Sequence, residues 1–171
     1  MTATHKHAGG TTVALRHRDT LIALADIPLV EAFLAIDRMD ILATHPAGIA
    51  VTGHLAAEIG DWEYKARYRA ALRVGQLNEV QITEAREVET FVRLGDSCLS
   101  PNERSAVTLA LHRGYRLALD HNNALAKALA SASARLSDIR LYHPREVIRD
   151  LVRSRTLDVE DGNRMTALWT E

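Results

Sequence analysis

The stretch LIALADIPLVEAFLAI (residues 21–36) decides the fold. With Thr20 it opens on a short apolar run, TLIALA (20–25), which predicts a buried strand that ends at Asp26. Pro28 then starts a predicted helix over 28–36, because proline is tolerated in the first helical turn. A strand followed at once by a helix is the repeating unit of α/β domains.

The same unit recurs along the chain. Further strands are predicted at GIAV (48–51), EVQIT (79–83), YRLAL (115–119) and IRLYH (139–143). Helical segments are predicted over 37–42, 53–60, 62–74, 84–95, 100–114, 122–134, 144–155 and 158–169. The strands are apolar without alternation, as expected when helices cover both faces of a sheet. We therefore predict a three-layer α/β/α domain over residues 20–171 with a central, mostly parallel sheet, preceded by a flexible segment over 1–19.

Composition limits the classes of function. The 171 residues are 47% hydrophobic and 25% charged, which indicates one globular domain and excludes a disordered chain. A net charge of −1 argues against a protein that coats nucleic acid electrostatically. The single cysteine, Cys98, excludes an intramolecular disulfide and favours a reducing compartment. Neither a secretory leader nor an apolar run of about 18 residues occurs, so we expect a cytoplasmic protein without a membrane partner.

Four acidic residues occupy positions of interest. Asp26 and Asp120 directly follow predicted strands, Glu58 lies in the helix after the GIAV strand, and Glu103 lies in the first turn of the helix before YRLAL. Ligands of open α/β sheets bind beyond the carboxyl ends of the strands, so the four side chains are expected to converge there. Ionised carboxylates share a small volume only with compensating cations, and oxygen ligands suit Mg²⁺ or Mn²⁺.

Each acid also has a purely structural interpretation. An aspartate after a strand often caps the next helix, which applies to Asp26 and Asp120. Glu103 completes the pattern Ser-x-x-Glu of a capping box. Glu58 lies one helical turn after His54 and could form a surface pair with it. Spacing alone leaves both interpretations open.

Several segments resemble a known family. The segment SPNERSAVTLALHRGYRLALDHNNALAKALA (100–130) resembles the second half of PIN-domain proteins. Upstream, LIALADIPLVEAFLAIDRMDIL (21–42) and IAVTGHLAAEI (49–59) resemble the opening strand and helix and the second strand of that family. PREVIRDLVRSRTLD (144–158) resembles its closing helix. The likeness spans about residues 20–158, and the nearest group is the prokaryotic toxin–antitoxin ribonucleases.

The resemblance implies a function. It assigns Asp26, Glu58, Glu103 and Asp120 as catalytic, metal-binding acids. It implies cleavage of single-stranded RNA that depends on Mg²⁺ or Mn²⁺, together with a homodimer and an antitoxin protein that blocks the site. Independently of the resemblance, His121, Asn122 and Lys127 are candidate substrate contacts, because they follow Asp120 at or near the start of the next predicted helix. His121 could equally be an exposed residue of the helix start, and Asn122 could serve only to satisfy the helix N-terminus.

The chain also departs from the family pattern. Ile27 and Pro28 stand where a small hydroxyl residue usually follows the first aspartate, and Asn102 replaces the glycine before the third acid. His121 stands where a second acid is common, and Lys127 substitutes for a basic residue expected slightly earlier. These changes keep a second function open, that of a catalytically degenerate PIN-like module that binds a protein or RNA partner. A small-molecule α/β enzyme is less favoured, because no Gly-rich phosphate loop follows a strand.

Two groups of arginines could hold phosphates. Arg69 and Arg73 share one helix face at i,i+4, and Arg145, Arg149 and Arg153 form a stripe at i,i+4,i+8. For each of these arginines a solvated helix face is the favoured interpretation, since Glu146 and Asp150 can pair with Arg149 and Arg153 at i,i+3.

Overall fold

The central sheet is entirely parallel. The structure, a computed structural model, describes residues 21–120 and 122–169, so the segment 1–19 predicted to be flexible lies outside the described residues. Within that part, five strands pair in the order β3-β2-β1-β4-β5, and every pairing is parallel. The strands are β1 (Ile22–Leu24), β2 (Ile49–Thr52), β3 (Asn78–Val80), β4 (Arg116–Ala118) and β5 (Arg140–Tyr142).

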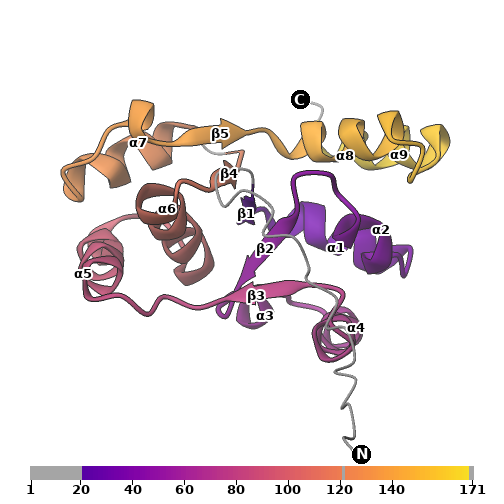
Figure 1. Cartoon of the computed structure of the whole chain (residues 1–171), viewed down its shortest axis with the longest axis horizontal. Helices are drawn as coiled ribbons and strands as arrows, with labels where there is room; N and C mark the ends of the chain where they lie inside the picture. Colours follow the sequence, from indigo (N-terminus) through magenta and orange to yellow (C-terminus); the bar gives the residue numbers. More distant parts are fainter. Residues whose placement is uncertain (1–20, 121, 170–171) are drawn as a thin grey trace, which may run out of the picture.

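Helices cover both faces of this sheet (Figure 1). They are α1 (Ile27–Ala35), α2 (Met39–Ala43), α3 (Leu55–Glu58), α4 (Trp62–Arg73), α5 (Ala85–Arg93), α6 (Pro101–Arg113), α7 (Asn122–Ser131), α8 (Pro144–Arg153) and α9 (Val159–Thr166), with 3-10 turns η2 (Leu94–Asp96), η3 (Leu136–Asp138) and η4 (Ala167–Trp169). Helices α1, α2, α4, α8 and α9 lie on one side, and α6 and α7 lie on the other, with α5 packed against α6. The predicted three-layer α/β/α architecture is confirmed.

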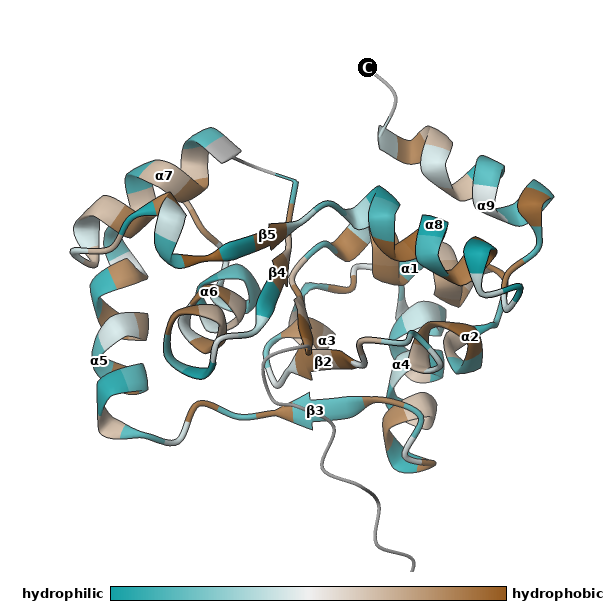
Figure 2. Ribbon diagram, turned by 45° about the horizontal axis from the view of Figure 1, so that its top comes forward, coloured by the Kyte–Doolittle hydropathy of each residue, from teal (hydrophilic) through white to brown (hydrophobic). Residues whose placement is uncertain are grey.

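Side chains of adjacent strand residues build two separate cores. In β1, Ile22 and Leu24 belong to the core under α1, whereas Ala23 belongs to the core under α6. All three are completely buried, which explains why the strand sequence is apolar without alternation. Figure 2 shows the contrast with the edge of the sheet, where β3 is hydrophilic beside the hydrophobic β2. No helix in the described ranges has the length and apolarity that crossing a membrane requires.

The strand order reverses between β1 and β4. The chain proceeds from β1 outward through β2 to β3. It then continues through helices α5 and α6 and returns to β4, which pairs with the other side of β1. In open α/β sheets, ligands bind in the crevice at such a reversal, outside the carboxyl ends of the strands. The fold therefore places the expected ligand site just beyond Leu24 and Ala118.

Several predicted element boundaries differ from those in the structure. Helix α7 ends at Ser131 rather than at 134, because Ser133 adopts a left-handed conformation with φ of 57°. The helix predicted over 53–60 is the short α3, with Thr52 as the last residue of β2 and His54 at the cap position. The Thr52 hydroxyl accepts a hydrogen bond from the His54 amide at 3.2 Å.

Candidate functional site

All four acids singled out in the sequence line one cavity. Its volume is about 360 Å³, and it opens at the carboxyl ends of β1 and β4, where the strand order reverses. Asp26, Glu58, Glu103 and Asp120 reach it from four separate segments of the chain. The structure thus brings together residues that are up to 94 positions apart, the span from Asp26 to Asp120.

Asp26 and Asp120 occupy equivalent positions on adjacent strands. Leu24 of β1 pairs in register with Ala118 of β4, and each aspartate follows its paired residue by two positions. The Ala25 amide continues the ladder by donating to the Ala118 carbonyl at 3.1 Å. Neighbouring strands lie about 4.8 Å apart, so this register places the two aspartates side by side at the edge of the sheet.

Asp26 also caps helix α1. Its Oδ1 accepts a hydrogen bond from the Leu29 amide at 2.8 Å, and Pro28 occupies the first helical turn. The side chain is only 6% exposed. The structural interpretation of Asp26 is therefore correct, and it coexists with a position in the cavity wall.

Glu58 is bound to the start of helix α6. Its Oε2 accepts from the Ser100 hydroxyl at 2.9 Å, and its Oε1 accepts from the Asn102 amide at 2.8 Å. A carboxylate at this position is favoured by the partial positive charge of a helix N-terminus. The alternative pairing with His54 does not form, since the His54 Nδ1 lies 2.8 Å from the Ser105 hydroxyl instead.

Glu103 closes the predicted capping box. Its Oε2 accepts from the Ser100 amide at 2.8 Å, while the Ser100 hydroxyl accepts from the Glu103 amide at 3.1 Å. Ser100 therefore touches both Glu58 and Glu103. Sequence reasoning treated Ser100 only as a cap and missed its contact with Glu58, which joins segments 42 residues apart.

Asp120 is paired with His143, a residue that sequence reasoning missed. The His143 Nε2 lies 2.8 Å from Asp120 Oδ1. The His143 Nδ1 accepts a hydrogen bond from the Arg145 amide at 3.1 Å, which leaves the ring proton on Nε2 to be donated to Asp120. His143 directly follows β5. The predicted strand over 139–143 included His143, so the rule that selected Asp26 and Asp120, a polar residue just after a strand, did not select it.

Asn102 connects the segments around the cavity by buried hydrogen bonds. It is completely buried; its Nδ2 donates to the Ala25 carbonyl at 3.0 Å, and its Oδ1 accepts from the Thr52 hydroxyl at 2.8 Å. These bonds tie α6 to the carboxyl ends of β1 and β2. Asn102 thus holds the segments that carry Asp26 and Glu58 together.

Of the candidate substrate residues, Lys127 is exposed on α7 and is not among the residues that line the acidic cavity. Asn122 begins α7, and His121 lies outside the described residues. Leu168 and Trp169 of η4 contribute another part of the cavity wall.

The donor chemistry suits a hard cation, but the side-chain arrangement is not that of a formed metal centre. The cavity offers carboxylate and hydroxyl oxygens, the ligands that Mg²⁺ and Mn²⁺ prefer. In the described ranges, no three His, Cys, Asp or Glu side chains are grouped so that they could hold a metal ion together. Each of the four carboxylates is instead directed at a hydrogen-bond donor of the protein.

No protein-family model, no curated protein and no solved structure matches the chain. The class that the fold and cavity define is a three-layer α/β domain with an acidic cavity at its strand-order reversal.

Proposed function

We propose that the protein is a nuclease that hydrolyses phosphodiester bonds of single-stranded RNA with the help of Mg²⁺ or Mn²⁺. The observation that carries this proposal is the convergence of Asp26, Glu58, Glu103 and Asp120 on one cavity at the strand-order reversal. The resemblance to PIN-domain ribonucleases assigned the same four residues independently of their spatial arrangement.

The residues of the cavity would act in two pairs. Asp26 and Asp120, side by side on β1 and β4, would supply oxygen donors to a cation, with Asp120 oriented by the Nε2 proton of His143. Glu58 of α3 and Glu103 of α6 both accept hydrogen bonds from Ser100, and they would supply further oxygen ligands to the cation. A bound divalent cation would provide charge neutralisation on the phosphate and activation of a water molecule.

A second candidate is a PIN-like module that binds a protein or RNA partner without cleavage. It is favoured by the way each acid is used within the protein, since Asp26 and Glu103 cap helices and Glu58 binds the start of α6. Such a module needs no cation to satisfy its carboxylates. Binding of Mn²⁺ therefore separates the two candidates.

The test is cleavage of a labelled, mixed-sequence single-stranded RNA with Mg²⁺, Mn²⁺ or EDTA. Asp120→Asn is expected to abolish cleavage, because it replaces a negatively charged oxygen ligand of the cation with a neutral amide. Asp37→Asn is the matched control, since Asp37 is exposed and has φ of 54°, a conformation that asparagine tolerates well. Absence of cleavage with every metal, together with a melting temperature unmoved by Mn²⁺, would favour the binding module.

The same proposal includes a homodimer, an antitoxin protein and a cytoplasmic location. Light scattering of the purified chain measures the oligomeric state, and co-purification of a second polypeptide from its natural host tests the antitoxin. Neither measurement depends on nuclease activity.

A further inference from the structure

A second cavity lies between helices α8 and α9. Its volume is about 460 Å³, and three arginines of α8, Arg145, Arg149 and Arg153, contribute to its wall. Ile148 and Gly162 are also part of the wall. No Asp or Glu from the described ranges lines this cavity, which we call the arginine groove.

The arginine groove follows from the geometry of the two helices. Residues spaced by four lie on one helix face, about 6 Å apart along the axis, so the three guanidinium groups form a row. Gly162 lets α9 approach α8 closely, because a Cβ at that position would lie 2.5 Å from the Val152 Cγ2. The result is a cavity between the two helices with one cationic wall.

Two of the three arginines lack an acidic partner within the described part of the chain. Arg153 pairs with Asp150 at 3.1 Å, whereas no ion pair to a described residue joins Arg145 or Arg149. The Nε of Arg145 is buried and has no hydrogen-bond partner there. Buried polar groups are nearly always hydrogen-bonded, so an unsatisfied guanidinium nitrogen indicates a site for an anion or water. The planar donor fork of arginine matches the oxygens of a phosphate.

The arginine groove and the acidic cavity flank the same short turn. Ala167 of η4 lines the groove, while Leu168 and Trp169 line the acidic cavity. A second segment also joins the two cavities. His143 pairs with Asp120 of the acidic cavity, and Arg145 of the groove follows His143 by only two residues. An extended chain lying in the groove would therefore lead towards the four carboxylates.

We propose that the arginine groove binds the phosphodiester backbone of the single-stranded RNA and leads it to the acidic cavity. This inference rests on the proposed function, because the strand that the groove holds is the substrate of that site. An acidic peptide would meet the same arginines, but its own carboxylates would be repelled by Asp26, Glu58, Glu103 and Asp120 further on. A phosphodiester strand arrives with the divalent cations that this cavity is proposed to bind.

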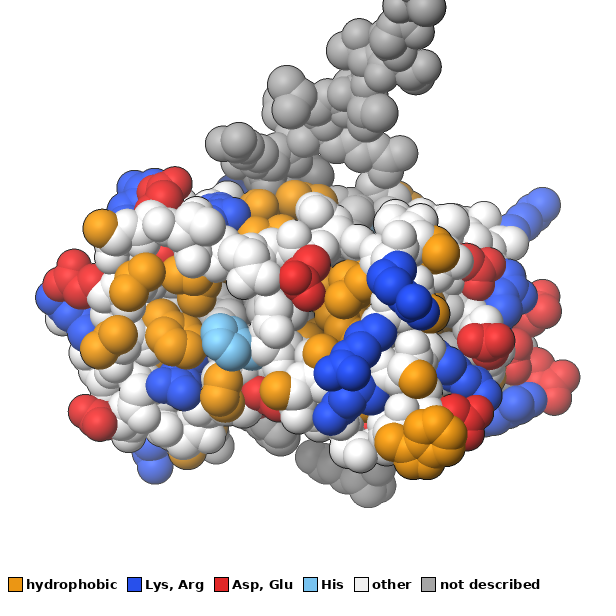
Figure 3. All heavy atoms as spheres, turned by 90° about the horizontal axis from the view of Figure 1, so that it is seen from below, with side chains coloured by type: hydrophobic (Ala, Val, Ile, Leu, Met, Phe, Trp, Pro, Cys, Tyr) orange, Lys and Arg blue, Asp and Glu red, His pale blue; other side chains and the backbone are white. Residues whose placement is uncertain are grey.

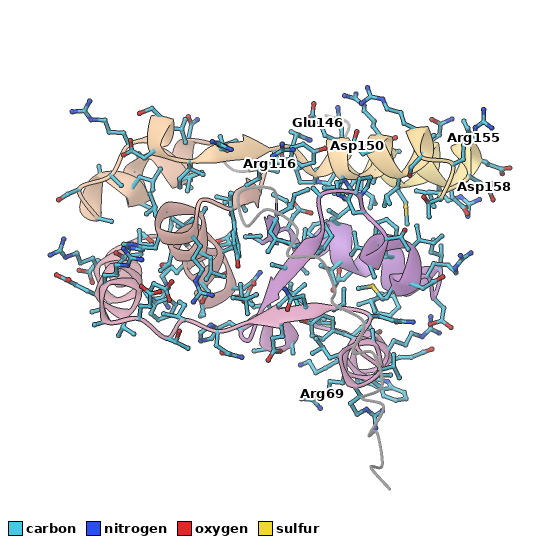
Figure 4. The ribbon with its side chains drawn as sticks, in the orientation of Figure 1. Arg69, Arg116, Glu146, Asp150, Arg155 and Asp158 are labelled. Carbon is cyan, nitrogen blue, oxygen red and sulfur yellow. The ribbon has the colours of Figure 1, made fainter. Side chains whose placement is uncertain are left out.

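Another cationic surface provides the control. Helix α4 carries the exposed Arg69 and Arg73, which are spaced i,i+4 like Arg145 and Arg149. Figure 3 shows Lys and Arg side chains gathered on the face of the molecule that is seen from below. Figure 4 shows Arg69 on the side of the molecule opposite Glu146 and Asp150 of α8. The pair Arg69 and Arg73 thus matches the groove arginines in spacing and charge but lies far from the groove.

The experiment measures binding of a fluorescent mixed-sequence single-stranded RNA to the full chain in EDTA, over a range of salt concentrations. EDTA prevents cleavage, so binding is read independently of the nuclease. R145Q/R149Q is expected to weaken binding about tenfold and to reduce the slope of log Kd against log salt by about 1.4, which corresponds to two lost phosphate contacts on a single strand. R69Q/R73Q is expected to leave both quantities unchanged. Because the Arg145 Nε is buried, R149Q/R153Q, which changes two exposed side chains, serves as a second variant with the same expectation.

Any of four results would overturn the inference. Three of them are an equal loss of binding in the α4 variant, an unchanged affinity in both groove variants, and wild-type protein that binds no RNA. Competition by polyglutamate as strong, charge for charge, as by unlabelled RNA would also overturn it and assign the groove to an acidic protein segment. The nuclease proposal fails separately, through absence of metal-dependent cleavage in a protein whose RNA binding still depends on the groove arginines.

Discussion

The imidazole of His143 donates its Nε2 proton to Oδ1 of Asp120 across 2.8 Å, while its Nδ1 accepts from the Arg145 amide. One ring therefore caps helix α8 and orients an acid of the candidate site. In metal centres, removal of a residue that hydrogen-bonds to a metal-binding side chain typically lowers metal affinity by about 10- to 100-fold.

We expect His143→Asn to weaken Mn²⁺ binding by about tenfold while leaving the melting temperature of the metal-free protein nearly unchanged. Asparagine is a good N-cap residue, so α8 keeps its cap, but its shorter side chain loses the contact with Asp120. Calorimetric titration with Mn²⁺ measures the affinity. His112→Asn, at the far end of α6, should bind Mn²⁺ like wild type. Equal affinities in the His143 variant and wild type would show that His143 serves only as a cap.

Asn102 is expected to contribute strongly to stability. Asn102→Ala leaves the Ala25 carbonyl without its 3.0 Å donor and the Thr52 hydroxyl without its 2.8 Å acceptor, in a completely buried location. An unsatisfied buried polar group costs about 1–3 kcal/mol, so we expect a loss of at least this size in the free energy of unfolding. Urea titration provides the value. Asn123→Ala, which changes an exposed asparagine of α7, should cost much less.

The ion pair of Glu87 and Arg113 is expected to make stability depend on pH. The guanidinium of Arg113 donates to both oxygens of the completely buried Glu87, at 2.6 and 2.8 Å, and lowers the pKa of that carboxyl to about 2. The folded pKa lies below the usual value of 4.5, so this stabilisation is fully present above about pH 5 and is lost as the pH falls towards 2.

Substitution isolates that contribution. Glu87→Gln should destabilise the protein by roughly 3 kcal/mol at pH 7, because it leaves Arg113 uncompensated, and the difference from wild type should shrink towards pH 2. Urea unfolding at several pH values between 7 and 2 measures both effects. Glu89→Gln, which breaks an exposed i,i+4 pair with Arg93, should change stability little at any pH. A pH-independent difference for the Glu87 variant would contradict this assignment.

The features that could be predicted from sequence are those encoded locally. Strand β1 is apolar along its whole length and ends at Asp26, so both the buried strand and the cavity residue were recognisable in one short segment. Ser100 and Glu103 form their capping box within four residues. The convergence of Asp26 and Asp120 could be inferred because parallel strands present their carboxyl ends at one edge.

The features that sequence reasoning missed depend on contacts between distant segments. Glu58 binds Ser100 and Asn102 rather than its helical neighbour His54, and nothing local indicates that α6 starts beside α3. From sequence alone, the arginine stripe of α8 is interpreted as a solvated helix face, since the cavity that it lines exists only because α9 packs beside α8. The pairing of β4 with β1 likewise results from a long crossover, which local patterns do not specify.

Gly162 is expected to set the packing of α9 on α8. A Cβ at this buried position would lie 2.5 Å from the Val152 Cγ2 and 3.6 Å from the Ile148 Cγ2, so Gly162→Ala must push the helices apart. Overpacking of this kind costs about 1–3 kcal/mol, although alanine favours helix formation over glycine. Gly60→Ala is the matched control, because no atom lies within 4 Å of its added Cβ. Thermal melting of the two variants should show a clear loss for Gly162→Ala and none for Gly60→Ala, and equal melting temperatures would mean that α9 does not pack as closely against α8 as the structure shows.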